Sequence, residues 1–503
     1  MICDLKKAEP SQERRKITCT KSLILVRLGN LIPTHNLMNF AGHSSLPVRN
    51  FHNGALLLSI ESTLKPAKEN LMPSNPSQHR PFSRRGLTLI EIMIALTMTL
   101  IVLGAMMQAF QYASGQMQMG RATMEMANRL RSAEELLRSD LNNLTVEPRP
   151  YTETTNPNGY LEIVDGAMRD KTNASGIDSY LGDVDDIVAM TVRSDGQFFR
   201  GRHIPDNTTS SQVIESSIAE VMWYTTFVDR DGDDLIDLDE SVKVHRRVLL
   251  IRPDMGPWEN LTSDQVTTLM QNNDISCRIV QDGGTNNYNV YANSLSDLAV
   301  RRNRFCHQWY NYDNGNPSLD VNWPHFLDRS LISTFQPVEG NDIVLTDVAS
   351  FDLQVYSPDV SLSLDAAIPV APADPGFPAA ATQISAGDFV DLVWNAPVDF
   401  RGSRFNFAQQ AWRNAFPAAE AFYDTWTPVY ESDGIDQDND ALIDEGTNGL
   451  DNGGSLAPDD DSERETRPPY PYPVRGVKVS IRLIEKTTNQ VYQSSVVHSY
   501  VPE

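Results

Sequence analysis

The sequence predicts an α+β protein in which a long N-terminal helix packs on a mainly antiparallel β head. Two observations predict this class. A run of 19 uncharged residues, 92–110, continues into a segment whose apolar residues have helical spacing. After it, short alternating or β-branched stretches recur to the end of the chain and favour antiparallel strands. With 503 residues, 40% of them apolar, the chain can bury a substantial core.

The charge is distributed unevenly along the chain. Residues 1–86 carry 13 Lys and Arg against 5 Asp and Glu, which leaves 29 and 61 for residues 87–503, a net charge of −32. The whole chain has a net charge of −24. A nucleic-acid binder needs a basic face to neutralise phosphates, so no nucleic-acid partner is expected.

The uncharged run is predicted to cross a membrane once. At 1.5 Å per residue it spans roughly 28 Å, close to the ~30 Å hydrocarbon core of a bilayer. Arg80, Arg84 and Arg85 precede it, so the positive-inside rule places the acidic remainder on the exported side. We expect residues 87–113 to form the membrane half of the helix. A cleaved secretory signal agrees less well with the sequence, because the best cleavage site for it, around Gly104, lies inside the uncharged run.

A glutamate stands at the edge of this run, in the string RRGLTLIE at 84–91. A carboxylate there is costly in lipid and marks a functional position. The stretch RRGLTLIEIMIALTM resembles the class III signal of type IV pilins and type II secretion pseudopilins. The resemblance implies that prepilin peptidase cleaves after Gly86 and that Leu87, where phenylalanine is most usual, is N-methylated. It also implies that Glu91 supports methylation and neutralises the terminal amine of a neighbouring subunit. An ordinary signal anchor is the alternative.

The resemblance also bears on the leader, residues 1–86, because class III leaders are usually short. Met72 would begin a 15-residue leader, MPSNPSQHRPFSRRG. We therefore expect translation to start at Met72, in which case residues 1–71 are not made.

The helix is expected to continue beyond the membrane as an amphipathic half, residues 114–147, closed by Pro148 and Pro150. Its segment ANRLRSAEELLRSDLNNL resembles the J-type minor pseudopilin of type II secretion. Apolar residues recur there in steps of three and four and form one stripe: Met119, Ala122, Met126, Leu130, Ala133, Leu137, Leu141 and Leu144.

Residues 148–503 are expected to form the exported, β-rich head, with long polar insertions at 254–295 and 303–330 and an Ala/Pro-rich stretch at 367–387. Strands are predicted at 161–164, 187–192, 218–228, 242–251, 343–356, 389–394, 474–484 and 491–501.

Two acidic loops share the pattern Asp-x-Asp-x-Asp-x-Leu-Ile-Asp and are predicted to bind calcium, which takes six to eight oxygen ligands. Solvated acidic turns are the alternative in both places. The candidate ligands in the first loop are Asp229, Asp231, Asp233, the main-chain carbonyl of Leu235, Asp237 and Glu240. Those in the second are Asp436, Asp438, Asp440, Asp444 and Glu445.

Cys277 and Cys306 are the two cysteines after the expected cleavage point. An exported location permits a disulfide between them, and two free buried thiols are the alternative. The sequence has no HExxH, CxxC, P-loop or Gly-x-Ser-x-Gly motif, so we do not expect an enzyme.

These features together favour a J-like minor pseudopilin at or near the tip of a type II secretion pseudopilus. The resemblance implies an inner-membrane protein with a periplasmic head. Its expected partners are other pilins or pseudopilins through the N-terminal helix, prepilin peptidase and secreted cargo. A minor pilin of a type IV pilus and a membrane-anchored exported enzyme or calcium-dependent binding protein are the alternatives.

Overall fold

The computed structural model shows residues Leu87–Glu503 as one compact unit. The residues that it describes are 86–150, 158–166, 181–205, 210–227, 240–281, 287–307, 312–313, 316–320, 325–337, 342–358, 360–365, 368–370, 383–385, 387–392, 421–437, 440–452, 454, 457–460, 463–466, 468–470, 473–486 and 489–500. Residues 1–85 of the leader and the first acidic loop up to residue 239 lie outside them.

The N-terminal helix α1 (Leu89–Asn142) is continuous over 54 residues. It begins with a capping box, in which the Thr88 hydroxyl accepts from the Glu91 N–H and the Glu91 carboxylate accepts from the Thr88 N–H. It ends at Asn142, with Asn143 as the C-terminal cap, a few residues before Pro148. The predicted long helix is therefore present, and its two halves have different surroundings.

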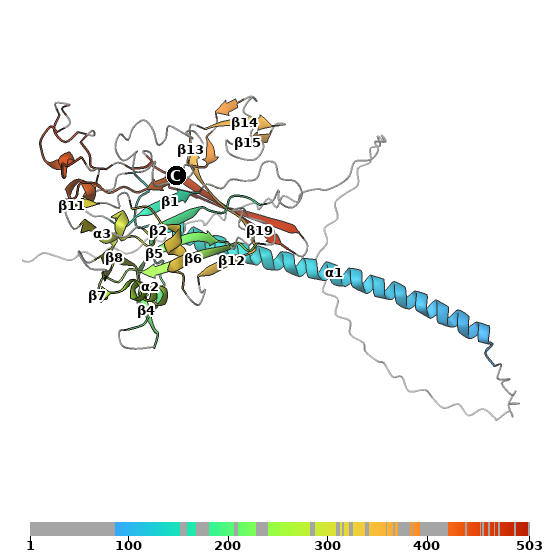
Figure 1. Cartoon of the computed structure of the whole chain (residues 1–503). Coiled ribbons are helices and arrows are strands. Elements are labelled where there is room, and N and C mark those ends of the chain that lie inside the picture. Colours follow the sequence, from blue (N-terminus) through green and yellow to red (C-terminus); the bar gives the residue numbers. More distant parts are fainter. Residues whose placement is uncertain are drawn as a thin grey trace, which may run out of the picture. The chain divides into compact units, whose positions relative to one another are not determined.

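The first half of α1 is uncovered, as Figure 1 shows, and its large apolar side chains between Leu87 and Tyr112 are 54–78% exposed. The second half packs on the head through a buried stripe. The predicted stripe is confirmed from Met126 to Leu141, whereas Met119 remains 37% exposed. The buried members are Met126, Leu130, Ala133, Leu137 and Leu141.

The centre of the head is a six-stranded antiparallel sheet in the order β12-β6-β5-β2-β1-β18. Alternate residues of its strands enter two cores on opposite faces. On β2, Val188, Met190 and Val192 join the core that contains α1, while Ile187 and Ala189 join the second core. The strands are β1 (Leu161–Asp165), β2 (Ile187–Arg193), β5 (Ile218–Thr226), β6 (Lys243–Leu250), β12 (Ile343–Thr346) and β18 (Ala421–Asp424).

A four-stranded antiparallel sheet, in the order β17-β13-β19-β20, shares the first core with α1. The predicted strand 343–356 is in fact two strands in different sheets. The break falls at Asp347, which has a φ of 59°, a left-handed conformation that interrupts an extended strand. The strands are β13 (Val348–Ser357), β17 (Asp388–Val390), β19 (Gly476–Glu485) and β20 (Gln490–Ser499).

The second core is covered by elements that the sequence patterns did not predict. The stretch 254–295, expected to be a polar insertion, contains a three-stranded sheet and helix α2. These covering elements are β7 (Trp258–Leu261), α2 (Ser263–Asn272), β8 (Cys277–Gln281), β9 (Tyr288–Ala292), α3 (Leu295–Leu298) and α4 (Arg329–Thr334).

The described residues also form three short 3₁₀ helices, η2 (Arg301–Asn303), η3 (Pro428–Ser432) and η4 (Glu445–Thr447). The remaining described strands are also short. They are β3 (Phe199–His203), β4 (Gln212–Ser216), β10 (Tyr312–Asp313), β11 (Asn316–Asp320), β14 (Ser361–Asp365), β15 (Ile368–Val370) and β16 (Gln383–Ser385). The helix and the antiparallel sheets agree with the predicted α+β class.

Candidate functional site

The exposed half of α1 is the first candidate surface. An 18-residue window in this helix has a mean hydropathy of 2.3 and no buried residue, so the helix is long and apolar enough to cross a bilayer. Gly86, Leu87 and Glu91, the residues of the predicted cleavage and methylation site, stand at its exposed N-terminal end. The Glu91 carboxylate is engaged there by Thr88 through both the backbone N–H and the hydroxyl, at 2.9 and 3.0 Å.

The buried half of α1 is fixed to the six-stranded sheet by a polar contact. Asp140, 3% exposed, accepts two hydrogen bonds from the Arg246 guanidinium, both at 2.7 Å, and one from Trp223 Nε1 at 2.8 Å. Asp140 is the aspartate of the Arg-x-Asp-Leu stretch in the segment that resembles the J-type pseudopilin. An aspartate of this sequence segment therefore fixes the helix to the sheet.

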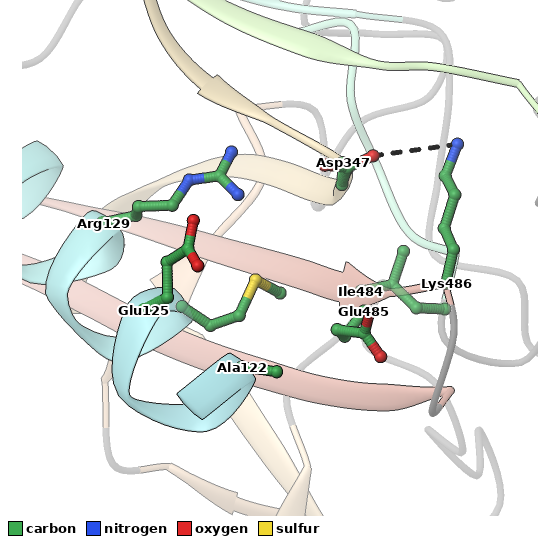
Figure 2. A pocket seen from close by; sticks show the side chains of 8 residues that line it. Ala122, Glu125, Arg129, Asp347, Ile484, Glu485 and Lys486 are labelled. Carbon is green, nitrogen blue, oxygen red and sulfur yellow. Dashed lines mark ion pairs between the residues drawn. The ribbon is translucent and has the colours of Figure 1, made fainter. Parts of the chain in front are cut away.

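A cavity of about 270 Å³ lies where α1 meets the ends of β12 and β19 (Figure 2). Figure 2 shows Glu125 and Arg129 on α1 at one side and Asp347, Glu485 and Lys486 at the other. Arg129 Nη2 donates to the Thr346 carbonyl at 3.1 Å, and Lys486 lies 3.9 Å from Asp347. Arg129 therefore links the helix to the head just C-terminal to its exposed half, whereas the Lys486–Asp347 pair lies within the head.

A buried aspartate triad, which the sequence patterns did not single out, is the strongest candidate metal centre among the described residues. Ligand oxygens of Asp165, Asp183 and Asp186 all lie within 4.8 Å of one another, and the three side chains are at most 5% exposed. The pairing of β1 with β2 places Val164 opposite Ile187, which brings Asp165 and Asp186 to the same end of the two strands. The string Gly182-Asp183-Val184-Asp185-Asp186 is the sequence signal that could have found it.

The surroundings of the triad disfavour ionisation of its carboxyl groups. Burial, together with the neighbouring Asp185 carboxyl, raises the pKa of Asp183 to about 10. Burial and the Asp183 carboxyl also raise the pKa of Asp186 far above its usual range. Asp186 is held in place by two backbone donors, the N–H groups of Gly166 at 2.9 Å and Leu353 at 2.6 Å. Three convergent carboxylates of this kind suit a hard cation such as calcium, which would replace the protons.

The second acidic loop is partly organised in the structure, although Asp438 lies outside the described residues. Asp436 and Glu445 are buried, whereas Asp440 is exposed. The Asp436, Asp440 and Asp444 carboxylates accept from the backbone N–H groups of Ala441, Leu442 and Gly434, respectively. Their side chains therefore shape the turn as well as offering oxygens.

Three glutamates from two segments meet beside this loop, and the sequence patterns had selected only Glu445. Glu465 accepts from the backbone N–H groups of Gln437 at 3.0 Å and Asp444 at 2.7 Å. Burial and the adjoining Glu445 carboxyl raise the pKa of Glu465 to about 10. Burial also raises the pKa of Glu431 to about 7, although the backbone N–H groups of residues 465 and 466 stabilise its charge.

Two buried side-chain oxygens in this acidic cluster accept no hydrogen bond, which bears on whether a cation could bind there. Glu445 Oε2 and Gln437 Oε1 are both buried, and neither has a hydrogen-bond donor among the described residues. A buried oxygen without a donor is costly, and a hard cation would satisfy it. Glu445 and Gln437 are therefore the described residues of the second loop that could offer unused buried oxygens to a cation. In the first loop only Glu240 is described; it is buried, and the remaining predicted ligands lie outside the described residues.

The predicted disulfide is absent, because Cys277 and Cys306 are both free in the structure. Both side chains lie in the apolar second core, where burial is the main cause that raises the thiol pKa of each residue. They pack there as small apolar groups in the neutral thiol form, the alternative left open by the sequence.

A buried ionic network beside the second core binds its segments together. Arg301 donates to Glu162 at 2.9 Å and to Asp424 at 3.0 Å, and Arg304 contacts the same two carboxylates at 2.9 Å. His307 Nε2 lies 2.9 Å from Glu162, and burial lowers the pKa of His307. Burial opposes ionisation of Glu162, but the surrounding Arg301 and His307 hold its pKa below the usual range. The network ties β1 and β18 to residues 301–307.

Comparison with known proteins gives no further assignment. No family model matches the chain, no curated protein matches it, and no solved structure matches its fold.

Proposed function

We propose that this chain is a J-like minor pseudopilin of a type II secretion system, a structural subunit at or near the pseudopilus tip. The observation that carries the proposal is the string RRGLTLIE placed directly before a helix whose first half is exposed and apolar and whose second half packs on a β-rich head. A signal anchor needs the apolar run but has no use for the glycine and glutamate at this spacing.

The proposed mechanism is assembly. Prepilin peptidase cleaves after Gly86, the new amine of Leu87 is methylated, and the helix leaves the inner membrane to join the helices of other subunits. In the filament the Glu91 carboxylate exchanges its contact with Thr88 for the terminal amine of a neighbour. An ammonium and a carboxylate in an apolar surrounding are tolerated as a pair.

Calcium is the cofactor proposed for the periplasmic head. Asp165, Asp183 and Asp186 would hold one ion, and Asp436, Gln437 and Glu445 would contribute to another. The first ion would supply positive charge that links β1 with residues 183–186, and the second would link the two ends of the second acidic loop. The protein groups bind and position; they carry out no reaction.

Mass spectrometry of the mature N-terminus tests the proposal. The full chain is expressed with a prepilin peptidase, and we expect a chain that begins at N-methylated Leu87. Gly86→Ala should abolish cleavage. Gly104→Ala is the matched control, because an added Cβ meets nothing within 4 Å at either glycine and neither change disturbs packing.

Glu91→Gln separates processing from assembly. It should be cleaved after Gly86 but should fail to join a pseudopilus with the other subunits. An uncleaved wild-type chain, or one cleaved near Gly104, would overturn the pilin interpretation. Normal processing combined with assembly only into a surface pilus would assign the chain to a type IV pilus.

A further inference from the structure

The outer edge of the four-stranded sheet has no role in the proposed function. β20 (Gln490–Ser499) is the last strand in the order β17-β13-β19-β20, and it pairs with β19 over its whole length without a shift in register. An edge strand carries a row of backbone N–H and C=O groups that its own sheet does not use. At ten residues, β20 is the longest edge strand in the described part of the chain.

The register shows which residues of β20 present these unused groups. The Tyr500 N–H donates to the Arg475 carbonyl at 2.9 Å, and the same register continues back to Gln490. Because hydrogen-bonded and non-hydrogen-bonded pairs alternate along an antiparallel ladder, the even-numbered residues of β20 bond to β19. The odd-numbered residues direct their N–H and C=O groups away from the sheet. Those without a backbone partner among the described residues are Val491, Gln493, Ser495 and Val497.

This edge lacks the features that usually prevent pairing with another chain. Natural edge strands are short, or they carry charged residues, proline or a bulge. Residues 490–500 include no Asp, Glu, Lys, Arg or Pro. The other edges of the two large sheets are blunted, because β17 and β18 have only three and four residues and β12 has a break in its register after Ile343. The edge of β20 is therefore suited to accept a further strand.

The helix α1 covers one face of β20 and leaves the other face exposed. On the covered face the Tyr492 hydroxyl donates to Thr123 Oγ1 at 2.7 Å, and Val496 is buried in the first core. On the opposite face the side chains of Gln493, Ser495 and Val497 are exposed. The contacts of α1 are thus made with side chains of one face, so the outward backbone groups of β20 are available to a partner.

The direction of β20 distinguishes a second copy of this chain from a different protein. Near its start Tyr492 contacts Thr123, and near its end burial and the positive charge of Arg138 lower the pKa of His498. β20 therefore runs in the same direction as α1, beside which its hairpin with β19 lies (Figure 1). Antiparallel pairing of two copies about a two-fold axis would point their helices in opposite directions. Their apolar halves could then not enter the same membrane.

We propose that the outer edge of β20 binds an extended segment of a partner protein, which adds a strand to the four-stranded sheet. Backbone hydrogen bonds along residues 491–497 supply the affinity. The uncharged side chains of Gln493, Ser495 and Val497 favour a partner segment that is itself uncharged and rich in β-branched residues. This binding needs no cleavage after Gly86, so it and the pseudopilin proposal can fail separately.

Fluorescence anisotropy with the full chain in detergent tests the binding. The probe is a fluorescein-labelled peptide of alternating valine and threonine with a lysine at each end. The comparison peptide has the same side chains but carries a methyl group on every backbone nitrogen, so it cannot donate backbone hydrogen bonds. We expect the first peptide to bind saturably and the methylated peptide to bind at least roughly 10-fold more weakly.

Val497→Pro should also weaken binding roughly 10-fold, because it removes an outward N–H that β19 does not use. Val497→Thr is the matched control, since it keeps this N–H and a β-branched side chain, and it should bind as the wild type does. Near-ultraviolet circular dichroism checks that both variants fold.

Ser495→Lys provides a second test that removes no backbone group. A lysine at the edge repels the lysine-capped peptide and should weaken its binding, whereas Val213→Lys adds the same charge at an exposed position on another strand and should not. Equal binding of the methylated peptide, no binding of the unmethylated one, or equal affinities of the Pro and Thr variants would overturn the proposal. A dimer in analytical ultracentrifugation that Val497→Pro abolishes would also overturn it and would assign the edge to a second copy.

Discussion

The contact between Asp140 and Arg246 gives the sharpest test of how α1 is held on the head. Asp140 is nearly completely buried and accepts three hydrogen bonds, two of them from one guanidinium. Asp140→Ala removes all three and leaves Arg246, whose side chain is 15% exposed, without its counter-charge. Removal of one partner of a buried ion pair typically lowers the free energy of unfolding by about 3–5 kcal/mol.

A second aspartate provides the matched control. Asp254 also accepts two hydrogen bonds from one arginine, Arg252, at 2.8 and 2.7 Å, but its side chain is 61% exposed. The geometry is the same and the burial differs, so Asp254→Ala should cost about 0–1 kcal/mol. Urea unfolding of the full chain in detergent, followed by near-ultraviolet circular dichroism, measures both free energies of unfolding.

Two further variants separate the unpaired charge from the loss of contacts. Asp140→Asn keeps an acceptor for Trp223 and should fall between wild type and Asp140→Ala. The pair Asp140→Leu with Arg246→Met removes both charges and should recover most of the lost stability, because no buried charge remains unpaired. If Asp140→Ala and Asp254→Ala destabilised the chain equally, the ion pair would not be what fixes the helix.

Three other predictions concern the buried acids and thiols. Burial favours the protonated form of Glu431 in the folded state, with a pKa of about 7 against a usual value of 4.5. Below pH 4.5 the protonated Glu431 carboxyl therefore contributes its full share to the free energy of unfolding, and this share is lost as the pH rises through 7. At about 1.4 kcal/mol per pKa unit, the contribution is about 3 kcal/mol. Glu431→Gln should flatten the decline in metal-free stability between pH 5 and pH 8; an unchanged slope in urea titrations would contradict this origin. Asp183→Asn should leave the melting temperature in a chelator unchanged at pH 7, since Asp183 is protonated there, but should reduce the rise that calcium produces; an undiminished rise would exclude Asp183 as a ligand. In the absence of reductant, iodoacetamide should alkylate Cys277 and Cys306 only after the chain has been unfolded, as peptide mass spectrometry can measure. A pair of peptides linked by a disulfide would refute the free thiols.

The long helix could be predicted because its determinants are local. Each of them depends on residues that are close in sequence. They are the apolar run, the Thr88–Glu91 cap and the stripe from Met126 to Leu141. The strands of the first core could be predicted for the same reason, since alternation is a property of neighbouring residues. By contrast, the split at Asp347 depends on one left-handed residue inside an apolar stretch that reads as continuous.

The second core and the aspartate triad were not predicted because their determinants are distant in sequence. The hairpin of β3 has the sequence FRGRH, which shows no apolar alternation, and it is positioned by contact with β6. Asp165 and Asp186 meet only through the register of β1 and β2, which no local pattern specifies. Glu465 joins the second acidic loop from about twenty residues downstream through backbone hydrogen bonds.

Several acidic side chains of the head are buried, which changes how the negative charge of the sequence is interpreted. A negative charge of this size would ordinarily be carried by solvated surface groups. Here Asp183, Asp186 and Glu465 are buried beside other carboxyls, and each has a pKa far above its usual range. At neutral pH such groups hold protons or a cation, so the formal charge of the sequence overstates the charge of the folded head. Calcium bound at these groups, as proposed, would have to release their protons. The apparent affinity for calcium should therefore rise with pH, opposite to the fall in metal-free stability that the same groups produce.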